Sequence, residues 1–443
     1  MSQGLFSSAD IDTGSRLLLR VLSQMWDDDK AAGRPLPVSV LDAGCGVGVL
    51  GICAGRALAA ENGDSHLFSQ LWVRAQDRDE LARAFTAFNA ALNGVFPSAL
   101  QAYTEPLLAG PGAPWDLILS NIPAKAGKPV LLDFISRAAA LLSPGGRTAL
   151  VIVNTLADLI RSRIIELGLA LIRDETGKGH TVLVFGPRPD ISPQKMAEEV
   201  ETEGTGTAGF LRQWPAYFRD AGDFEIETCS YHIDAFQGVA DFDTPSGAVQ
   251  AAAKLVKRLG LRPAAGPILV HEPDQGHFPA WLLQHLGTGK PPQAITGLLV
   301  LSGRNILALE AARHNSFLAL EGGMGGNDTR NCGAGESSAR KTGAFGIILA
   351  PAVDLLMDRE VLAAAAHGAY SFITLFPELV PQTDRLGAYW DGLAALLADG
   401  GVGVIALPSS GAERFDREKP KGFTRLGDFK RKGFRALAYR HSG

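Results

Sequence analysis

Two short stretches of the chain combine residue types that could do chemistry, and the first surrounds Asp42. This acid ends an apolar run, and glycines follow it at alternate positions, at Gly44, Gly46 and Gly48. Glycines at this spacing allow a tight turn and leave no side chain between the backbone and a ligand, while the helix behind them offers unpaired N–H groups. The stretch predicts a ligand-binding turn; the alternative is a strand-to-helix connection that binds nothing.

The second stretch is the turn Asn121-Ile122-Pro123, which follows another apolar run. An exocyclic amine on a base is a poor nucleophile because its lone pair is delocalised into the ring. The side-chain oxygen of Asn121 and the backbone carbonyl of Ile122 could both accept hydrogen bonds from such an amine, which would favour a pyramidal nitrogen and aim its lone pair. Pro123 stiffens the turn. These three residues are the candidate catalytic residues; the alternative is that Asn121 only caps the turn.

Three further residues are candidates for contacts with a bound cofactor. Asp77 ends the apolar run 71–76, where an acid can accept hydrogen bonds from ribose hydroxyls, whereas Asp79 is expected to cap the next helix. Gly14 and Ser15 begin a predicted helix and are included for that reason, although a plain helix cap is the alternative. The cysteines do not have the spacing of a metal site, so no metal is expected.

Apolar runs typical of strands alternate with stretches at helical spacing through the first half of the chain. This alternation indicates an α/β fold with a doubly wound, mostly parallel sheet. The two turns would then emerge at the carboxyl ends of strands, where ligands bind in such sheets. The predicted strands lie at 38–41, 71–76, 100–103, 115–120, 147–153 and 180–185.

The second half of the chain repeats this order of elements at a coarse scale. A polar segment at 189–224 is predicted to link a first domain at 1–188 to a second domain at 225–443. In the second copy only Gly276 remains of the three glycines. We expect Ser302 in place of Asp77, and Ala350-Pro351-Ala352 in place of the Asn121 turn. The second domain is therefore predicted to share the fold and to have lost the chemistry.

Composition limits the classes of partner. The chain has 443 residues and a formal net charge of −5, so it has no overall positive field for nucleic acid. The segment 414–440 is locally basic, with phenylalanines between the charges. It could follow phosphates and stack on bases, or form an edge hairpin with phenylalanines in the core. Scattered cysteines, no leader pattern and no apolar run of about 18 residues predict a cytoplasmic protein that does not enter a membrane.

The pattern Asp-x-Gly-x-Gly-x-Gly resembles the first motif of the class I S-adenosylmethionine-dependent methyltransferases. Residues 1–188 are similar to the "small" methyltransferase domain of the ribosomal RNA (guanine-N2-)-methyltransferases. The matching motifs fall in that family's order and spacing: Phe6-Ser7, 12–15 with the leucines at 17–19, 41–48 and 120–127. The family also pairs an active with a degenerate domain. The resemblance implies two Rossmann-like methyltransferase-fold domains with doubly wound, mostly parallel sheets, the second of them degenerate.

The resemblance also implies roles for the candidate residues. S-adenosyl-L-methionine would be the cofactor, with its methionine part held by Asp42 and the glycines and its ribose held by Asp77, while Asn121 and the following turn would hold the target amine. The expected reaction is methylation of the exocyclic amine of a guanine in ribosomal RNA.

Two other functions stay open. Ala124 stands where the family has an aromatic residue, and the degenerate domain comes second here but first in the family. The missing ring and the acidic net charge favour a small-molecule or protein-amide acceptor, and a non-catalytic methyltransferase-like scaffold is the third possibility. The sequence does not determine the oligomeric state.

Overall fold

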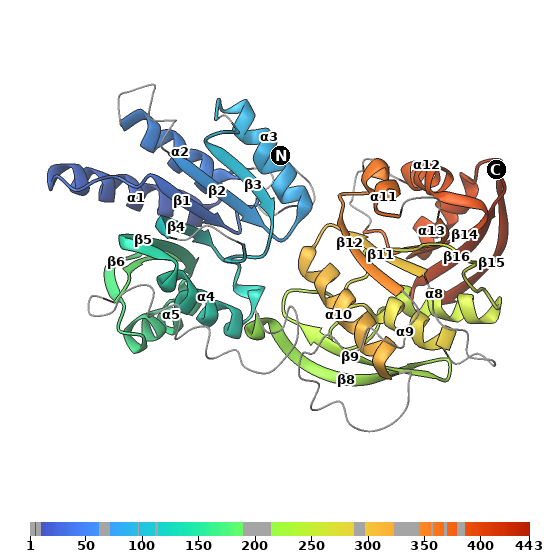
Figure 1. The fold of residues 1–443 in the computed structure, drawn as a ribbon. Coiled ribbons are helices and arrows are strands. Elements are labelled where there is room, and N and C mark those ends of the chain that lie inside the picture. The colour runs from blue at the N-terminus through green and yellow to red at the C-terminus, as the bar shows by residue number, and fades with distance from the viewer. Residues whose placement is uncertain are drawn as a thin grey trace. The chain divides into compact units, whose positions relative to one another are not determined.

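The computed structural model describes Leu5 and residues 10–61, 71–95, 97–110, 114–188, 214–287, 297–322, 345–355, 358–366, 370–378 and 386–443. The chain forms two compact units, Met1–Thr205 and Gly206–Gly443 (Figure 1). No helix within the described ranges has the length and apolar character needed to cross a membrane.

The first unit is built on a seven-stranded sheet in the order β3-β2-β1-β4-β5-β7-β6. Strands β3, β2, β1, β4 and β5 pair in parallel, and β7 runs antiparallel to both β5 and β6. The central strands are buried apolar runs, as expected for a sheet that is covered on both faces. The strands are β1 (Ser39–Ala43), β2 (Trp72–Asp77), β3 (Leu100–Thr104), β4 (Trp115–Asn121), β5 (Leu142–Val153), β6 (Ala170–Thr176) and β7 (His180–Gly186).

Helices cover both faces of this sheet (Figure 1). Buried side chains of α1, α2 and α3 form one cluster with alternate residues of the strands, such as Val40, Val73 and Leu117. The helices α4 and α5 pack together on the other side (Figure 1). The helical elements are α1 (Thr13–Ala31), α2 (Val49–Glu61), α3 (Glu80–Leu92), the short 3-10 helix η2 (Ala124–Ala126), α4 (Lys128–Ala140) and α5 (Asn154–Glu166).

The second unit has a seven-stranded sheet with the equivalent order, β12-β11-β10-β13-β14-β16-β15. The predicted fold class, two Rossmann-like domains with doubly wound, mostly parallel sheets, is therefore confirmed. The strands are β10 (Ile268–His271), β11 (Gly297–Gly303), β12 (Phe345–Pro351), β13 (Tyr370–Leu375), β14 (Leu397–Pro408), β15 (Phe423–Arg431) and β16 (Phe434–His441). The helices are α8 (Gly247–Arg258), α9 (His277–Gly287), α10 (Ile306–Gly322), α11 (Arg359–Ala366), α12 (Leu386–Leu396) and α13 (Ser409–Arg417).

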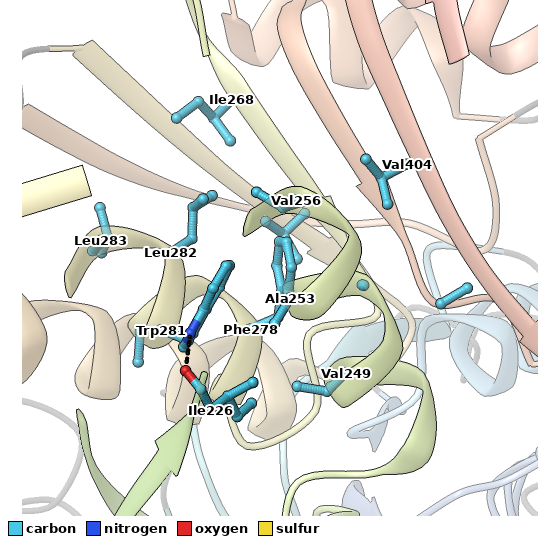
Figure 2. Close-up of a cluster of buried hydrophobic side chains, with 14 of the residues drawn as sticks. Ile226, Val249, Ala253, Val256, Ile268, Phe278, Trp281, Leu282, Leu283 and Val404 are labelled. Atoms are coloured by element: carbon cyan, nitrogen blue, oxygen red, sulfur yellow. Dashed lines mark hydrogen bonds between the residues drawn. The ribbon is translucent and has the colours of Figure 1, made fainter. Parts of the chain in front are cut away.

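A two-stranded hairpin, β8 (Phe218–Ile226) with β9 (Cys229–Phe236), precedes this second sheet. Figure 2 shows its anchor, Trp281 of α9, whose indole Nε1 donates a hydrogen bond of 3.1 Å to the carbonyl oxygen of Ile226 inside a buried apolar cluster. The strand β8 begins inside the predicted linker at 189–224, of which 189–213 lies outside the described residues. The sequence of β8 is mostly polar because most of its side chains are exposed. It forms a strand because it pairs with β9.

Backbone hydrogen bonds match the glycine turn of the first unit to its counterpart in the second. The N–H of Gly48 donates to the carbonyl of Cys45 at 2.8 Å, and the N–H of Gly276 donates to the carbonyl of Pro273 at the same distance. Helices α2 and α9 begin directly after Gly48 and Gly276. The equivalent positions of the two turns are therefore Gly44 and Glu272, Gly46 and Asp274, and Gly48 and Gly276.

The same register corrects our placement of Ser302. The carbonyl of Ser302 accepts from the second turn as the carbonyl of Gln76 accepts from the first, so these two residues are equivalent. Gly303, and not Ser302, stands in place of Asp77. The expectation was wrong by one residue because an apolar run carries no information about strand register.

The expected counterpart of the Asn121 turn is also wrong. The strand β12, which contains Ala350 and Pro351, lies at the edge of its sheet in the position of β3, whereas β13 pairs with β10 as β4 pairs with β1. Phe376, directly after β13, therefore replaces Asn121. Both β12 and β13 are apolar runs followed by proline, and sheet order alone distinguishes them.

The basic segment at the end of the chain forms the edge hairpin β15–β16. Phe415 and Phe423 are buried in the core, and Arg425 and Arg435 both form ion pairs with Asp428. The alternative of an edge hairpin with phenylalanines in the core is confirmed for Phe415 and Phe423, which cannot stack on bases, whereas Phe429 and Phe434 are half-buried.

Candidate active site

The glycine turn connects β1 to α2 in a conformation that few side chains adopt. The φ angles of Gly44, Gly46 and Gly48 are 78°, 56° and 87°. A Cβ atom added at Gly46 would meet nothing within 4 Å, whereas one at Gly48 would lie 2.9 Å from the Cδ1 atom of Ile52. Gly48 is therefore required by packing against the helix. Gly46 borders open space, in which a ligand can lie against the backbone.

Asp42 lies in β1 next to this turn and is fully buried. Its Oδ2 atom accepts a hydrogen bond of 2.7 Å from the N–H of Gly51 in α2, and its Oδ1 atom has no hydrogen-bond partner. Burial and, to a smaller extent, the negative charge of Asp77 raise the pKa of Asp42 to about 7, although the hydrogen bond from Gly51 opposes the shift. A buried carboxylate oxygen without a partner is costly, so this atom points to a ligand that donates a hydrogen bond.

Asp77 ends β2 and holds the glycine turn. Its Oδ2 atom accepts from the N–H of Gly46 at 3.0 Å, and its Oδ1 atom accepts from the N–H of Asp79 at 3.0 Å. Burial raises the pKa of Asp77 although these N–H groups oppose the shift. Asp79 caps α3 as predicted, since its side chain accepts from the N–H of Leu81.

A buried polar network supports the segment that follows β3, and sequence reasoning missed it. The guanidinium of Arg74 pairs with Glu105 at 2.7 Å and donates to the side-chain oxygen of Gln76 at 2.7 Å. The Gln76 amide donates to the backbone carbonyl of Ala109 at 2.7 Å, which fixes this segment beside the glycine turn. The sequence did contain a signal, since Arg74 and Gln76 interrupt an otherwise apolar strand. Both side chains are buried in the structure.

Asn121 ends β4, and its side chain reaches the first turn of α1. Its Nδ2 atom lies 3.2 Å from Oδ1 of Asp12 and 3.1 Å from Oγ of Ser15. Asp12 is the N-cap of α1 and accepts from the N–H of Ser15 at 3.0 Å. Partial burial opposes ionisation of Asp12, but hydrogen bonds from Ser15, Asn121 and Gly14 outweigh it and lower the pKa of Asp12. Sequence reasoning did not connect Asp12 with Asn121.

The structure brings the two turns to the same edge of the sheet. Strands β1 and β4 are neighbours, and the hydroxyl of Ser120 donates a hydrogen bond of 2.6 Å to the carbonyl of Ala43, the last residue of β1. Asn121 and the glycine turn therefore emerge side by side at the carboxyl ends of adjacent parallel strands. The side chain of Ile122 is buried and anchors its turn, whereas Pro123 is exposed.

Among the described residues, no group of three or more His, Cys, Asp or Glu side chains could hold a metal ion. The residues gathered at this edge are the buried carboxylate of Asp42, the half-buried carboxylate of Asp77, a glycine turn and an amide. Phe6-Ser7 lies outside the described residues.

Comparisons with known proteins agree with this geometry. Residues 1–161 match the family described as "Methyltransferase small domain". The chain is 33% identical over 154 residues to the ribosomal RNA small subunit methyltransferase C of Chromohalobacter salexigens and 28% identical over 151 residues to the uncharacterized protein YbxB of Bacillus subtilis. The matches cover 33% and 34% of this chain, and span only 39% and 65% of the lengths of those relatives.

One solved structure is similar over both units. A T. thermophilus 16S rRNA N2 methyltransferase (RsmC), in complex with AdoMet and guanosine, aligns with a TM-score of 0.57 and 17% sequence identity. The alignment covers 99% of this chain and 94% of that protein. At this identity the likeness shows a shared fold with two units.

Proposed function

We propose that the first unit, whose residues 1–161 match the family described as "Methyltransferase small domain", transfers the methyl group of S-adenosylmethionine to the exocyclic amine of a guanine in ribosomal RNA. The observation that carries this proposal is the pair of polar groups at one edge of the sheet. An unpartnered carboxylate oxygen of Asp42 lies at one turn, and the oriented amide of Asn121 lies at the neighbouring turn.

The residues of the glycine turn fit S-adenosylmethionine. The unpaired Oδ1 of Asp42 suits the ammonium group of the methionine part, and the open space at Gly46 lets the cofactor approach the backbone. Asp77 is the proposed partner of the ribose. When bound, the cofactor supplies a methyl group on a sulfonium: the attacking nitrogen forms the new C–N bond as the C–S bond breaks, and the nitrogen's proton leaves to water.

Asn121 supplies the orientation of the acceptor. Its Oδ1 atom accepts a hydrogen bond from the amine, and the carbonyl of Ile122 is the proposed second acceptor, so the lone pair is turned toward the methyl donor. Pro123 stiffens this turn, with a φ angle of −66°. The ribosomal RNA part of the proposal is supported by the names of the curated relative and the solved structure, and the guanine part by the name of the solved structure.

A second candidate is a small-molecule or protein-amide acceptor. It is favoured by the turn 121–127, which carries no aromatic side chain to stack on a base and exposes Pro123, Ala124 and Lys125 instead. Transfer of labelled methyl groups to ribosomal RNA, to small amines and to protein fractions from the same cells separates the two candidates.

The test of the cofactor site compares S-adenosylmethionine binding by wild type and Asp42→Ala in calorimetry. We expect the variant to bind at least about 100-fold more weakly, because a charge-assisted contact in a buried site is lost. Asp274→Ala is the matched control, since it removes an acid from the equivalent turn of the second unit, and it should bind like wild type. Equal affinity of wild type and Asp42→Ala would reject the site. Wild-type methylation of protein or small amines but not of RNA would reject the acceptor.

A further inference from the structure

We infer that Asp12 and Ser15 are positioning residues that fix the side-chain amide of Asn121 in one orientation, so that the site accepts only a nitrogen that carries a proton. The inference rests on the proposed function of Asn121 as the residue that holds the acceptor. It adds two residues to that function and restricts the chemical class of the acceptor group.

The orientation of Asn121 follows from the chemistry of its partner. An ionised carboxylate can only accept hydrogen bonds, whereas an amide has one end that donates and one that accepts. The pKa of Asp12 lies below its usual value, so this side chain is an anion at neutral pH. The group 3.2 Å from its Oδ1 must therefore be the NH₂ of Asn121, and the carbonyl oxygen must point away from α1.

Ser15 completes a closed set of hydrogen bonds. Its backbone N–H and its hydroxyl both donate to Asp12, and its hydroxyl oxygen accepts from Nδ2 of Asn121 at 3.1 Å. Ser15 is buried and Asp12 and Asn121 are half-buried, so these contacts are partly shielded from water. The NH₂ of Asn121 thus has two acceptors on α1, and Oδ1 remains for a substrate. Charge-assisted hydrogen bonds of this kind hold an orientation better than neutral ones.

The first turn of α1 is itself held in place by β7. A Cβ atom at Gly14 would lie 3.0 Å from Oδ1 of Asp12 and 3.1 Å from the ring of His180, so glycine lets these two side chains pack closely against the helix start. The His180 ring also contacts the hydroxyl of Thr13, with 3.3 Å between Nδ1 and Oγ1. Asp12 and Ser15 therefore sit on a rigid element, which is what positioning to a fraction of an ångström requires.

The second unit has the same fold but no counterpart of Asn121, so it shows how the equivalent helix begins without that residue. Its helix α8 is capped by Ser246, whose hydroxyl accepts from the N–H of Val249 at 3.3 Å. Counted from the caps, Val249 takes the place of Ser15, and the strand register puts Phe376 in the place of Asn121. A serine is thus enough to start the helix. The carboxylate of Asp12 is therefore not needed to start the helix. All three residues of the hydrogen-bonded set, Asp12, Ser15 and Asn121, are replaced in the second unit.

A fixed amide oxygen has a chemical consequence. An exocyclic amine or a primary amide can donate a hydrogen bond to Oδ1 of Asn121, whereas an unprotonated ring nitrogen or a carboxylate presents only lone pairs and is repelled. The proposed acceptor class is therefore an N–H group.

The experiment compares wild type with Asp12→Ser, which keeps a helix cap but is too short and uncharged to hold Asn121. We expect kcat for methyl transfer to fall about 100-fold because the acceptor is misplaced, while the affinity for S-adenosylmethionine stays within about threefold. The matched control is Ser246→Asp, which installs the carboxylate at the equivalent cap of the second unit and should leave kcat unchanged. Ser15→Ala serves as a second variant and should lower kcat in the same direction.

A readout independent of activity separates this inference from the proposed function. The side-chain NH₂ signals of Asn121, assigned by their loss in Asn121→Ala, should exchange slowly with water in the full-length wild type and rapidly in Asp12→Ser. Fast exchange in wild type, or an unchanged kcat in both Asp12→Ser and Ser15→Ala, would overturn the inference. If wild type transfers no methyl group to any acceptor, the proposed function fails, and the exchange measurement still decides whether Asp12 orients Asn121.

Discussion

The two equivalent turns share a backbone and differ in nearly every side chain. Gly44 and Gly46 have φ angles of 78° and 56°, and their counterparts Glu272 and Asp274 have 54° and 47°. Residues other than glycine adopt this left-handed conformation at a cost of about 1–2 kcal/mol each. The second unit keeps this conformation at both positions although neither residue is glycine. The two turns thus have the same backbone conformation, although the second turn lacks the glycines at two of the three positions.

The replacements in the second unit are coordinated. Gly51 lies three residues after Gly48 and donates its N–H to the buried carboxylate of Asp42. Val270 takes the place of Asp42, and Pro279, three residues after Gly276, takes the place of Gly51. Proline has no N–H, so no donor is left unpaired when the acid is lost. The second turn is therefore a stable structure in its own right.

In the second unit a carboxylate from a different position takes the place of the Asp77 side chain. Gly303 replaces Asp77, and a Cβ atom added there would lie 2.9 Å from Oε2 of Glu272. The other oxygen of Glu272 accepts from the N–H of Arg304 at 3.0 Å. A side chain from the turn thus fills the space that the Asp77 side chain occupies in the first unit. The comparison indicates that the first turn differs from the second in leaving its backbone bare, which is the property that the proposed cofactor site needs.

The substitution expected to have the largest effect on cofactor binding is Gly44→Glu, which places in the first turn the residue that the second turn has at the equivalent position, Glu272. A carboxylate there would meet Asp77 and cover the backbone, so we expect S-adenosylmethionine to bind at least about 100-fold more weakly, a loss of about 2.7 kcal/mol. Calorimetry measures it. The reciprocal Glu272→Gly is the control and should bind like wild type, while normal binding by Gly44→Glu would contradict the view that the bare turn is what binds.

Two buried groups should give opposite pH dependences, Asp42 in the first unit and His271 in the second. Burial raises the pKa of Asp42 from 3.8 to about 7, so the stability that this residue contributes is complete below pH 4, and about 4 kcal/mol of it is lost as the pH rises to 7. Burial lowers the pKa of His271 from 6.5 to about 4, so the second unit loses about 3 kcal/mol from this residue as the pH falls from 6.5 to 4.

Hydrogen exchange, read separately on amides of the two units, checks this contrast. Asp42→Asn should remove the loss of stability between pH 4 and 7 from the first unit alone. His271→Ala, which copies Ala43, should remove the loss below pH 6.5 from the second unit alone, in which the raised pKa of Asp274, about 8, adds a separate loss as the pH rises. Identical pH profiles of wild type and both variants would mean that neither group is buried as the structure has it.

The smallest expected effect comes from relieving backbone strain. Asp274→Gly copies Gly46 into the second turn and should stabilise that unit by about 1 kcal/mol, since glycine adopts a positive φ without strain. Urea unfolding measures the gain. Asp274→Ala separates strain from charge, because it removes the buried carboxylate and keeps the Cβ atom. A gain in Asp274→Ala as large as that in Asp274→Gly would assign the effect to the charge.

Much of the first unit could be predicted from local patterns. The acid and glycines at 42–48 encode a strand, a tight turn and a helix within a dozen residues, and all three are formed as expected. The alternation of strands and helices predicted the parallel sheet, and with it the position of Asn121 beside the glycine turn. These inferences succeed because each depends on residues close together in the chain or on the rule that parallel strands end at one edge.

Contacts between distant segments were beyond that reasoning. No local pattern connects Asp12 with Asn121, and their meeting depends on how α1 packs against the sheet. The assignments of Ser302 and Ala350 failed for the same reason, since apolar runs of similar composition can take any place in a sheet until hydrogen bonds set their order and register. Spacing along the chain therefore specified the turns and the chemistry they offer, whereas packing in three dimensions selected which side chains orient the site.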